Sequence, residues 1–289
     1  MGPYYIIHLY SGRRRPLDFH AATETMLARY PHLSVKVLSI DTAVDPSLNV
    51  HSPELWTFLL GVAAEGRVLG LLQGPLCETW TPARHHALID DHGRERRGPR
   101  PLRTTDDLWG ILRLSLAELE QISIGNILLL KDLVLACVVT LDGGATFLEH
   151  PAMPWDDSIS SIWRLVIIRL LLRHPHGLFR RITAEQWRFG SCSVKPTTCL
   201  YSNTNLPLAL GACIDRSAAQ PTQHLIGRCN DGTFKTMRAK EYPGRLNQAF
   251  ALVIANSISH WHLTSGPCHH EPYGLQLAVI PARTEYSSI

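Results

Sequence analysis

The chain has 289 residues, of which 45% are hydrophobic and 18% charged, a profile typical of a globular protein with a core. The net charge of +3 excludes a polycation, so any affinity for nucleic acid must come from local basic clusters. Seven cysteines without a CxxC pair or regular spacing favour a reduced intracellular protein over a disulfide framework.

The sequence contains no visible targeting signal. The first residues lack the basic region and long apolar core of a secretory signal. No apolar run is expected to reach transmembrane length, and the apolar run 162–172 is interrupted by Arg164 and Arg169. An intracellular location is therefore expected, with the nucleus as a plausible compartment.

The N-terminal region predicts a nucleotide-binding unit. The expected order is a strand over 5–10, a turn with Ser11 and Gly12, a helix over 19–30, and a strand over 35–40 that ends on Asp41. In the βαβ plan the terminal acid binds ribose hydroxyls, which predicts that role for Asp41. The alternative is that Asp41 only caps a turn.

A thiol follows the next expected strand. A helix begins at about Ser52, and the apolar run 68–72 after it indicates a buried strand that Gly74 and Pro75 end. Cys77 then lies on a turn at the carboxyl end of that strand, where catalytic groups of open α/β sheets gather. Cys77 is either a nucleophile or a small packed hydrophobe. A hydrolase that pairs Cys77 with His85 or His86 is a further alternative.

A basic loop follows Cys77. Five arginines fall within ten residues: Arg94, Arg96, Arg97, Arg100 and Arg103. Such a cluster predicts contacts with phosphates. The alternative is a solvated surface loop, which is what most charge runs form.

The C-terminal half alternates strands and helices. The expected elements are a helical region after Thr105 that breaks near Gly125, a strand over 146–148, a helix over 160–173, and strands over 179–183 and 198–201. Residues 203–235 are expected to be irregular, and a helix is expected over 246–257. The tail contains histidines and a cysteine, but their spacing matches no established zinc site, so no metal is predicted.

The order of these pieces resembles the cytosine-5 DNA methyltransferases, which use S-adenosylmethionine. Residues 77–81, Cys-Glu-Thr-Trp-Thr, are similar to the catalytic Cys-Gln-x-Phe-Ser of that family, and 147–151 resemble its strand ending in Glu-Asn-Val. Residues 184–195 resemble its Tyr-Gly segment leading to Gln-x-Arg-x-Arg, and 246–249 resemble its Gly-Asn-Ala helix, which places Asn247 at the methyl-donor pocket. The likeness spans about residues 5–258 and looks like a divergent branch seen in protist and mobile-element open reading frames.

The resemblance implies a fold and a chemistry. The fold would be α/β, a Rossmann-like, mostly parallel sheet of about seven strands with helices on both faces, as in class I methyltransferases. It would occupy 1–258, with a short irregular insert over 203–235 in place of a target-recognition domain, and 259–289 would form a weakly structured tail.

The implied reaction methylates a flipped cytosine, in DNA rather than RNA. Cys77 would add to C6 of the base, Glu149 would act as an acid at N3, and Lys195 would stabilise charge near O2. Ser11, Gly12, Asp41 and Asn247 would hold S-adenosylmethionine.

The chain departs from the family where Arg13, Arg14 and Arg15 follow Gly12 in place of a second glycine. This departure keeps a second hypothesis open, a catalytically inactive nucleic-acid-binding module.

Overall fold

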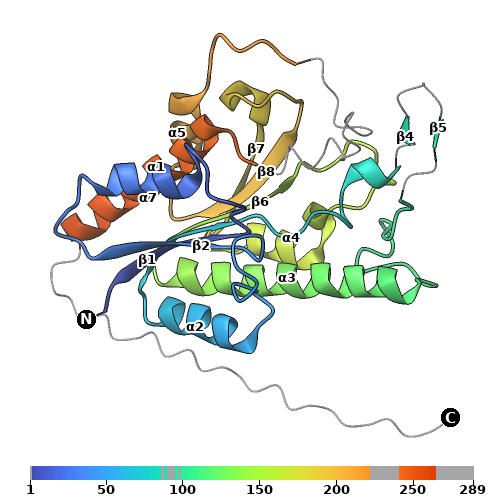
Figure 1. The fold of residues 1–289 in the computed structure, drawn as a ribbon, viewed down its shortest axis with the longest axis horizontal. Coiled ribbons are helices and arrows are strands. Elements are labelled where there is room, and N and C mark those ends of the chain that lie inside the picture. Colours follow the sequence, from blue (N-terminus) through green and yellow to red (C-terminus); the bar gives the residue numbers. More distant parts are fainter. Residues whose placement is uncertain (1, 86–87, 90–94, 97–98, 222–240, 265–289) are drawn as a thin grey trace, which may run out of the picture.

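A six-stranded mixed sheet organises the fold (Figure 1). The structure is a computed structural model that describes residues 2–85, 88–89, 95–96, 99–221 and 241–264. The strand order is β2-β1-β3-β6-β8-β7. The strands are β1 (Tyr4–Leu9), β2 (Val35–Ile40), β3 (Val68–Gln73), β6 (Ala145–Pro151), β7 (Arg180–Glu185) and β8 (Pro196–Ser202).

The sheet confirms the α/β class and corrects the expected strand number from about seven to six. Neighbouring strands from β2 to β6 pair in parallel, whereas β8 runs antiparallel to both β6 and β7. A separate two-stranded ribbon of β4 (Leu88–Ile89) and β5 (Glu95–Arg96) lies in the segment that was expected to be a loop.

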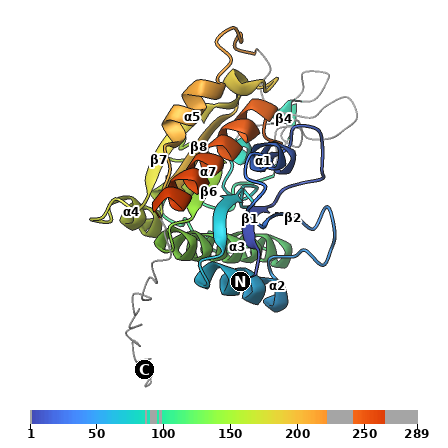
Figure 2. The ribbon, with the colours of Figure 1, turned by 90° about the vertical axis from the view of Figure 1, so that its left-hand side faces the viewer.

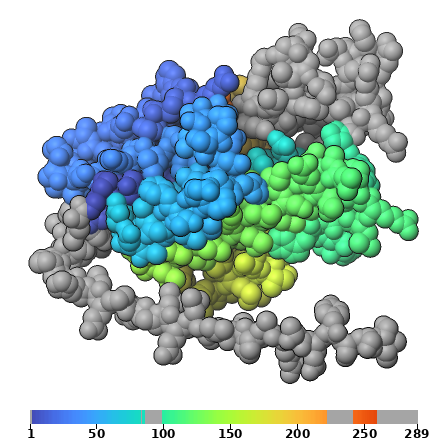
Figure 3. Space-filling view, turned by 60° about the horizontal axis from the view of Figure 1, so that its bottom comes forward, coloured from blue at the N-terminus to red at the C-terminus, as the bar shows by residue number. Residues whose placement is uncertain are grey.

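Helices cover both faces of the sheet (Figure 2). One face carries α2 (Pro53–Ala64) and α3 (Leu116–Leu141), which lie side by side in Figure 3. The other carries α1 (Phe19–Leu27), α5 (Leu206–Cys213) and α7 (Gly244–Thr264). Because the inner strands are covered on both faces, they are apolar without alternation: Ile6 and Ile7 on β1 are both fully buried.

α3 is one continuous helix, so the expected start at Thr105 and the expected break at Gly125 are both wrong. Ser115 caps it through a capping box with Glu118. Gly125 lies inside the helix because a side chain there would crowd the neighbouring loop. An added Cβ would lie 3.3 Å from Thr79 Oγ1 and 3.4 Å from Arg103 Nη2.

α3 also corrects the expectation that no apolar run reaches membrane-spanning length. By length and composition alone it could cross a membrane, but half of its most apolar window is buried inside the fold. Its inner face packs Leu129, Leu133 and Ala136 in a core cluster with Trp163. A core helix of this kind is weak evidence for a span.

The C-terminal half differs from its expected bounds at three places. The helix expected over 160–173 divides into a short turn, η2 (Ile162–Arg164), and α4 (Val166–Leu172), because Leu165 is extended. α5 forms inside the segment expected to be irregular. α7 continues to Thr264, past the expected domain boundary at 258, and the tail beyond it lies outside the described residues.

The sheet positions one edge for function. The chain leaves β1 for β2 on one side and returns to β3 on the other, so strand order reverses at β1. Ligands of open α/β sheets bind outside the carboxyl ends of strands at such a reversal. The sequence analysis singled out residues that follow β1, β2 and β3 along the chain, and Glu149 near the carboxyl end of β6.

Candidate active site

Adjacent strand ends bring the Cys77 turn to Glu149. β3 and β6 pair in parallel with Gln73 beside Leu148, so Gly74, the first residue after β3, lies next to Glu149, which is still paired with Cys199 on β8. A Cβ at Gly74 would lie 2.7 Å from the Tyr242 hydroxyl and 3.9 Å from Glu149 Oε2. Gly74 therefore permits a close approach that any side chain would block.

Glu149 is the centre of a buried polar cluster. Only 6% of the residue is exposed, and both carboxylate oxygens accept hydrogen bonds. Thr197 Oγ1 donates to Oε1, and the Tyr242 hydroxyl donates to Oε2 at 3.1 Å. Lys195 Nζ lies 3.7 Å from Oε1. Two separate segments, 195–197 and the one that carries Tyr242, thus hold this carboxylate in one orientation, as a positioned acid–base group requires.

Tyr242 is a site residue that the sequence analysis missed. Burial raises the pKa of its hydroxyl well above the ordinary value, and the charges of Glu149, Cys199 and Cys77 raise it further. Tyr242 therefore keeps its proton and donates it to Glu149 as a hydrogen bond. A lone tyrosine before Pro-Gly gives no sequence signal for such a role.

Cys77 lies on a tight turn and is half-buried rather than sealed in the core. The Trp80 backbone N–H donates to the Cys77 carbonyl at 2.9 Å, which closes the turn. Trp80 itself is buried, with 2% exposed, and anchors the turn in the core beside α3. For the hydrolase alternative, His86 lies outside the described residues, and His85 acts electrostatically on Asp156 after β6.

Arg103 fastens the Cys77 turn, which corrects its expected role as a phosphate ligand. The residue is fully buried and its guanidinium lies 3.7 Å from the Trp80 ring centroid. It donates to Thr79 Oγ1, to the Leu108 carbonyl and to Asn126 Oδ1. Burial lowers the pKa of Arg103 to about 9. A guanidinium enclosed in this way cannot reach a phosphate.

The other arginines of the expected basic loop divide into two groups. Arg100 forms a two-pronged ion pair with Glu118, at 2.7 Å for each contact, and so ties the loop to the first turn of α3. Arg84 supports the same connection by donating to the Arg100 carbonyl and to Gln121 Oε1 on α3, each at 3.1 Å. Arg96 lies in β5. Arg94 and Arg97 lie outside the described residues, so their expected phosphate contacts stay predictions.

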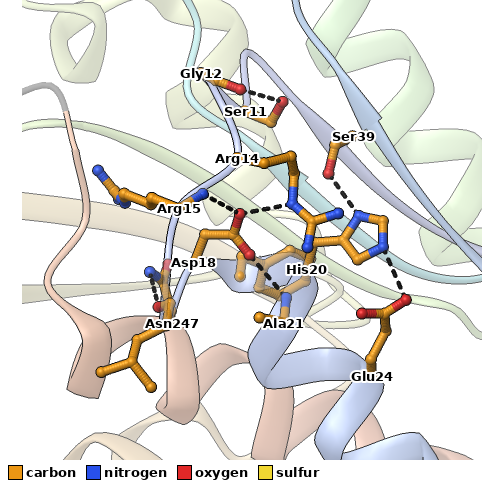
Figure 4. A network of polar contacts seen from close by, with 12 residues as sticks. Ser11, Gly12, Arg14, Arg15, Asp18, His20, Ala21, Glu24, Ser39 and Asn247 are labelled. Atoms are coloured by element: carbon orange, nitrogen blue, oxygen red, sulfur yellow. Dashed lines mark hydrogen bonds and ion pairs between the residues drawn. The ribbon is translucent and has the colours of Figure 1, made fainter. Parts of the chain in front are cut away.

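Ser11, Gly12 and Asp41 meet at the carboxyl ends of β1 and β2. The Gly12 N–H donates to Asp41 Oδ2 at 2.9 Å, and the Ala43 N–H donates to Asp41 Oδ1 at 2.7 Å. Asp41 therefore closes its own turn and also holds the loop after β1. The Ser11 hydroxyl bonds the Gly12 carbonyl at 3.2 Å, as Figure 4 shows.

Asn247 holds this loop from the α7 side (Figure 4). Its amide donates to the Leu17 carbonyl at 2.9 Å and to the Tyr242 carbonyl at 3.3 Å. Arg15 also donates to the Tyr242 carbonyl, at 2.9 Å, and pairs with Glu241. Tyr242 therefore joins the loop after β1 to the Glu149 cluster through one residue.

The residues near Gly12 fit a nucleoside ligand at two points. Gly12 has a φ of +68°, and a Cβ there would meet no atom within 4 Å, which leaves open space above its backbone. Asp41 uses one acceptor position on each oxygen, and a carboxylate offers about four in all, so it can still accept hydroxyl groups. Asn247 is 1% exposed, so its contribution would be to position the loop.

Comparisons of this chain with protein-family models, with curated protein sequences and with solved structures found no match. Within the described ranges, His, Cys, Asp and Glu side chains form no group of three or more that could hold a metal ion. Function is therefore inferred from the geometry and chemistry of the site.

Proposed function

We propose that the chain is a divergent cytosine-5 nucleic-acid methyltransferase, with Cys77 as nucleophile and Glu149 as the acid–base group. The observation that carries the proposal is that the chain leaves β3 at Gly74, which lies next to Glu149 near the carboxyl end of the neighbouring parallel strand β6. This arrangement presents a half-buried thiol and a buried, oriented carboxylate at one edge of the sheet.

Each residue of the Glu149 cluster has a role in this chemistry. The Cys77 thiolate would add to C6 of a flipped cytosine and give C5 the electron density to attack a methyl group. Glu149 would bond the base at N3 and C4-amino positions, held by Thr197 and Tyr242. Lys195 would stabilise negative charge near O2. Loss of the C5 proton then expels the thiolate and restores the ring.

The fold supports the same proposal. The reversal of strand order at β1 and the helices on both faces are features of Rossmann-like sheets. S-Adenosylmethionine would supply the electrophilic methyl group when bound. Ser11, Gly12 and Asp41 would hold its nucleoside part, and Asn247 would keep the Leu17 loop in place behind them.

Methyl transfer from labelled S-adenosylmethionine to cytosine-containing DNA tests the proposal. We expect transfer by the wild-type protein and none by Cys77→Ser. Cys137→Ser is the matched control, since Cys137 is a half-buried thiol on α3, away from the strand ends. Equal activity in both variants, or no transfer by the wild type to DNA or RNA, contradicts the proposal.

A second candidate is a catalytically inactive nucleic-acid-binding module. One observation favours it. The Gly12 N–H, which could otherwise bond S-adenosylmethionine, already donates a hydrogen bond to Asp41. Calorimetry separates the two candidates. No heat on titration with millimolar S-adenosylmethionine favours the inactive module, whereas saturable binding favours the enzyme.

A further inference from the structure

The arginine-rich segment from α4 to β7 stands out from the rest of the surface. Between Leu165 and Ala184 the chain carries four arginines and two histidines but no aspartate or glutamate. The arginines are Arg169 and Arg173 on and after α4, and Arg180 and Arg181 at the start of β7. All four are exposed. Within the described part of the chain, none of the four side chains has a hydrogen-bonding or ion-pair partner.

Packing beneath the segment brings the two arginine pairs together. Ile168, which precedes Arg169, and Phe179, which precedes Arg180, are both buried in the same core cluster. The end of α4 and the start of β7 are therefore held against one core. The result is a local concentration of positive charge on a chain whose total is only +3.

The geometry points to the phosphate backbone of a nucleic acid as the partner of Arg169, Arg173, Arg180 and Arg181, which form a track around the free edge of the sheet. The inference rests on the proposed function for the identity of the polyanion. β7 is the last strand of the sheet, and its residues alternate between faces. Ile182 packs with the α7-side cluster, so Arg180 shares that face and Arg181 lies on the other.

Because the arginines lie on both faces of the edge strand, they favour a chain-like polyanion over a flat one. A membrane surface would suit the exposed Val166 and Leu170 on α4, which are 62% and 64% exposed. A plane cannot contact both faces of an edge strand, however, whereas a flexible phosphate backbone can follow the edge and meet arginines on each side. Arginine forks also match phosphate oxygens in geometry.

The track lies close to the candidate site. Arg180 is paired with Tyr201 on β8, and Tyr201 with Phe147 on β6, two residues before Glu149. Two strand spacings and two residues of rise separate the backbones of Arg180 and Glu149 by roughly 12 Å. A single strand whose base lies beside Glu149 would reach the track within a few nucleotides.

Fluorescence anisotropy with a labelled single-stranded oligonucleotide that lacks cytosine tests the track separately from the chemistry. Binding by the full chain should weaken as salt rises. Replacing all four arginines with alanine should reduce the slope of log K against log salt by about 3, since each phosphate contact to a single strand contributes about 0.7. Arg181→Glu should weaken binding at least tenfold. Arg29→Glu should not, because Arg29 is an exposed arginine after α1, far from the track in sequence.

An unchanged salt slope in the fourfold variant, or equal losses in Arg181→Glu and Arg29→Glu, would overturn the inference. So would a fourfold variant that keeps oligonucleotide binding but loses sedimentation with phosphatidylserine vesicles, which would indicate a lipid surface. Circular dichroism should show the same thermal midpoint in all variants. Normal oligonucleotide binding without methyl transfer would contradict the proposed function and leave the track intact.

Discussion

The two halves of the strand-end edge use their polar groups differently. At β3 and β6, side chains from two segments, 195–197 and Tyr242, converge on Glu149, and the half-buried Cys77 lies on the turn after β3. At β1 and β2, the polar groups bond one another: Asp41 accepts from the Gly12 N–H, and Asn247 holds Leu17. The first half is arranged around a reactive group, whereas the second is arranged around its own loop.

This difference indicates which variants should change ligand binding without changing stability, and which should change both. The β3–β6 half depends on support that is far from it in sequence, so its variants should alter both stability and chemistry. In the β1–β2 half, Asp41 accepts only from the backbone N–H groups of Gly12 and Ala43, so an Asp41 variant should alter ligand binding with little effect on folding. Tyr242 joins the halves, because its hydroxyl bonds Glu149 and its carbonyl accepts from Arg15 and Asn247.

The largest expected effect is on the support of the Cys77 turn. Arg103→Leu should lower the free energy of unfolding by about 3–5 kcal/mol, because Thr79, the Leu108 carbonyl and Asn126 lose a buried donor and each unsatisfied acceptor costs about 1–3 kcal/mol. Urea unfolding measures the change. Arg100→Ala is the control, since that ion pair is half-exposed and should contribute only about 0–1 kcal/mol. Similar losses in both variants would show that Arg103 is not a special anchor.

Acid should destabilise both halves through one buried histidine in each. Burial lowers the pKa of His8 on β1 and of His150 on β6 from 6.5 to about 3. The unfolded chain therefore binds protons that the folded chain refuses, so stability is full above pH 6.5 and falls as the pH drops toward 3. Between pH 6.5 and 5 the loss should be about 2 kcal/mol per histidine. Urea unfolding at both pH values tests this, and His150→Leu should remove half of the loss.

Tyr242→Phe should affect the Glu149 half alone. Removing the hydroxyl leaves Glu149 Oε2 short of a buried hydrogen bond, which should cost about 1–2 kcal/mol in unfolding free energy. Methyl transfer should fall tenfold or more, while affinity for S-adenosylmethionine stays the same, because the Tyr242 carbonyl remains. Tyr201→Phe is the control on β8. If Tyr242→Phe also lost affinity for S-adenosylmethionine, the distinction between the β3–β6 half and the β1–β2 half would not hold.

The smallest effect on stability is expected at Asp41. Asp41→Asn retains one acceptor for the Gly12 N–H, so the unfolding free energy should fall by less than about 1 kcal/mol. Calorimetry should nevertheless show about tenfold weaker binding of S-adenosylmethionine. Unchanged donor affinity would favour the turn-capping interpretation of Asp41 and, with it, the inactive module.

The sequence alone predicted the helices and strands whose signals lie within the element itself. The apolar runs at 5–10, 35–40 and 68–72 are β1, β2 and β3 within one or two residues, and the helix expected over 19–30 begins at Phe19 as α1. The helix break predicted at Gly125 was wrong because this glycine serves a tertiary contact: it makes room for Thr79 and Arg103 against α3.

The same division holds at the candidate site. Cys77 and Glu149 were identifiable because Cys77 follows an apolar strand and Glu149 comes directly after the apolar residues of another, and pairing of β3 with β6 brings those strand ends together. Tyr242 and the anchoring role of Arg103 depend on contacts between segments far apart in sequence, which no local pattern encodes. An arginine looks the same in sequence whether it is stacked on a buried tryptophan or exposed to a phosphate.

The most direct measurement of the central claim is covalent trapping of an oligonucleotide that contains 5-fluorocytosine, in the presence of S-adenosylmethionine. Fluorine at C5 cannot leave as a proton does, so the bond between the Cys77 sulfur and C6 should persist and be visible on a denaturing gel. The wild type and Cys137→Ser should form the adduct, and Cys77→Ser should not. An adduct that survives Cys77→Ser, or a wild type that forms none while binding both donor and oligonucleotide, would contradict the claim that Cys77 and Glu149 form an active site.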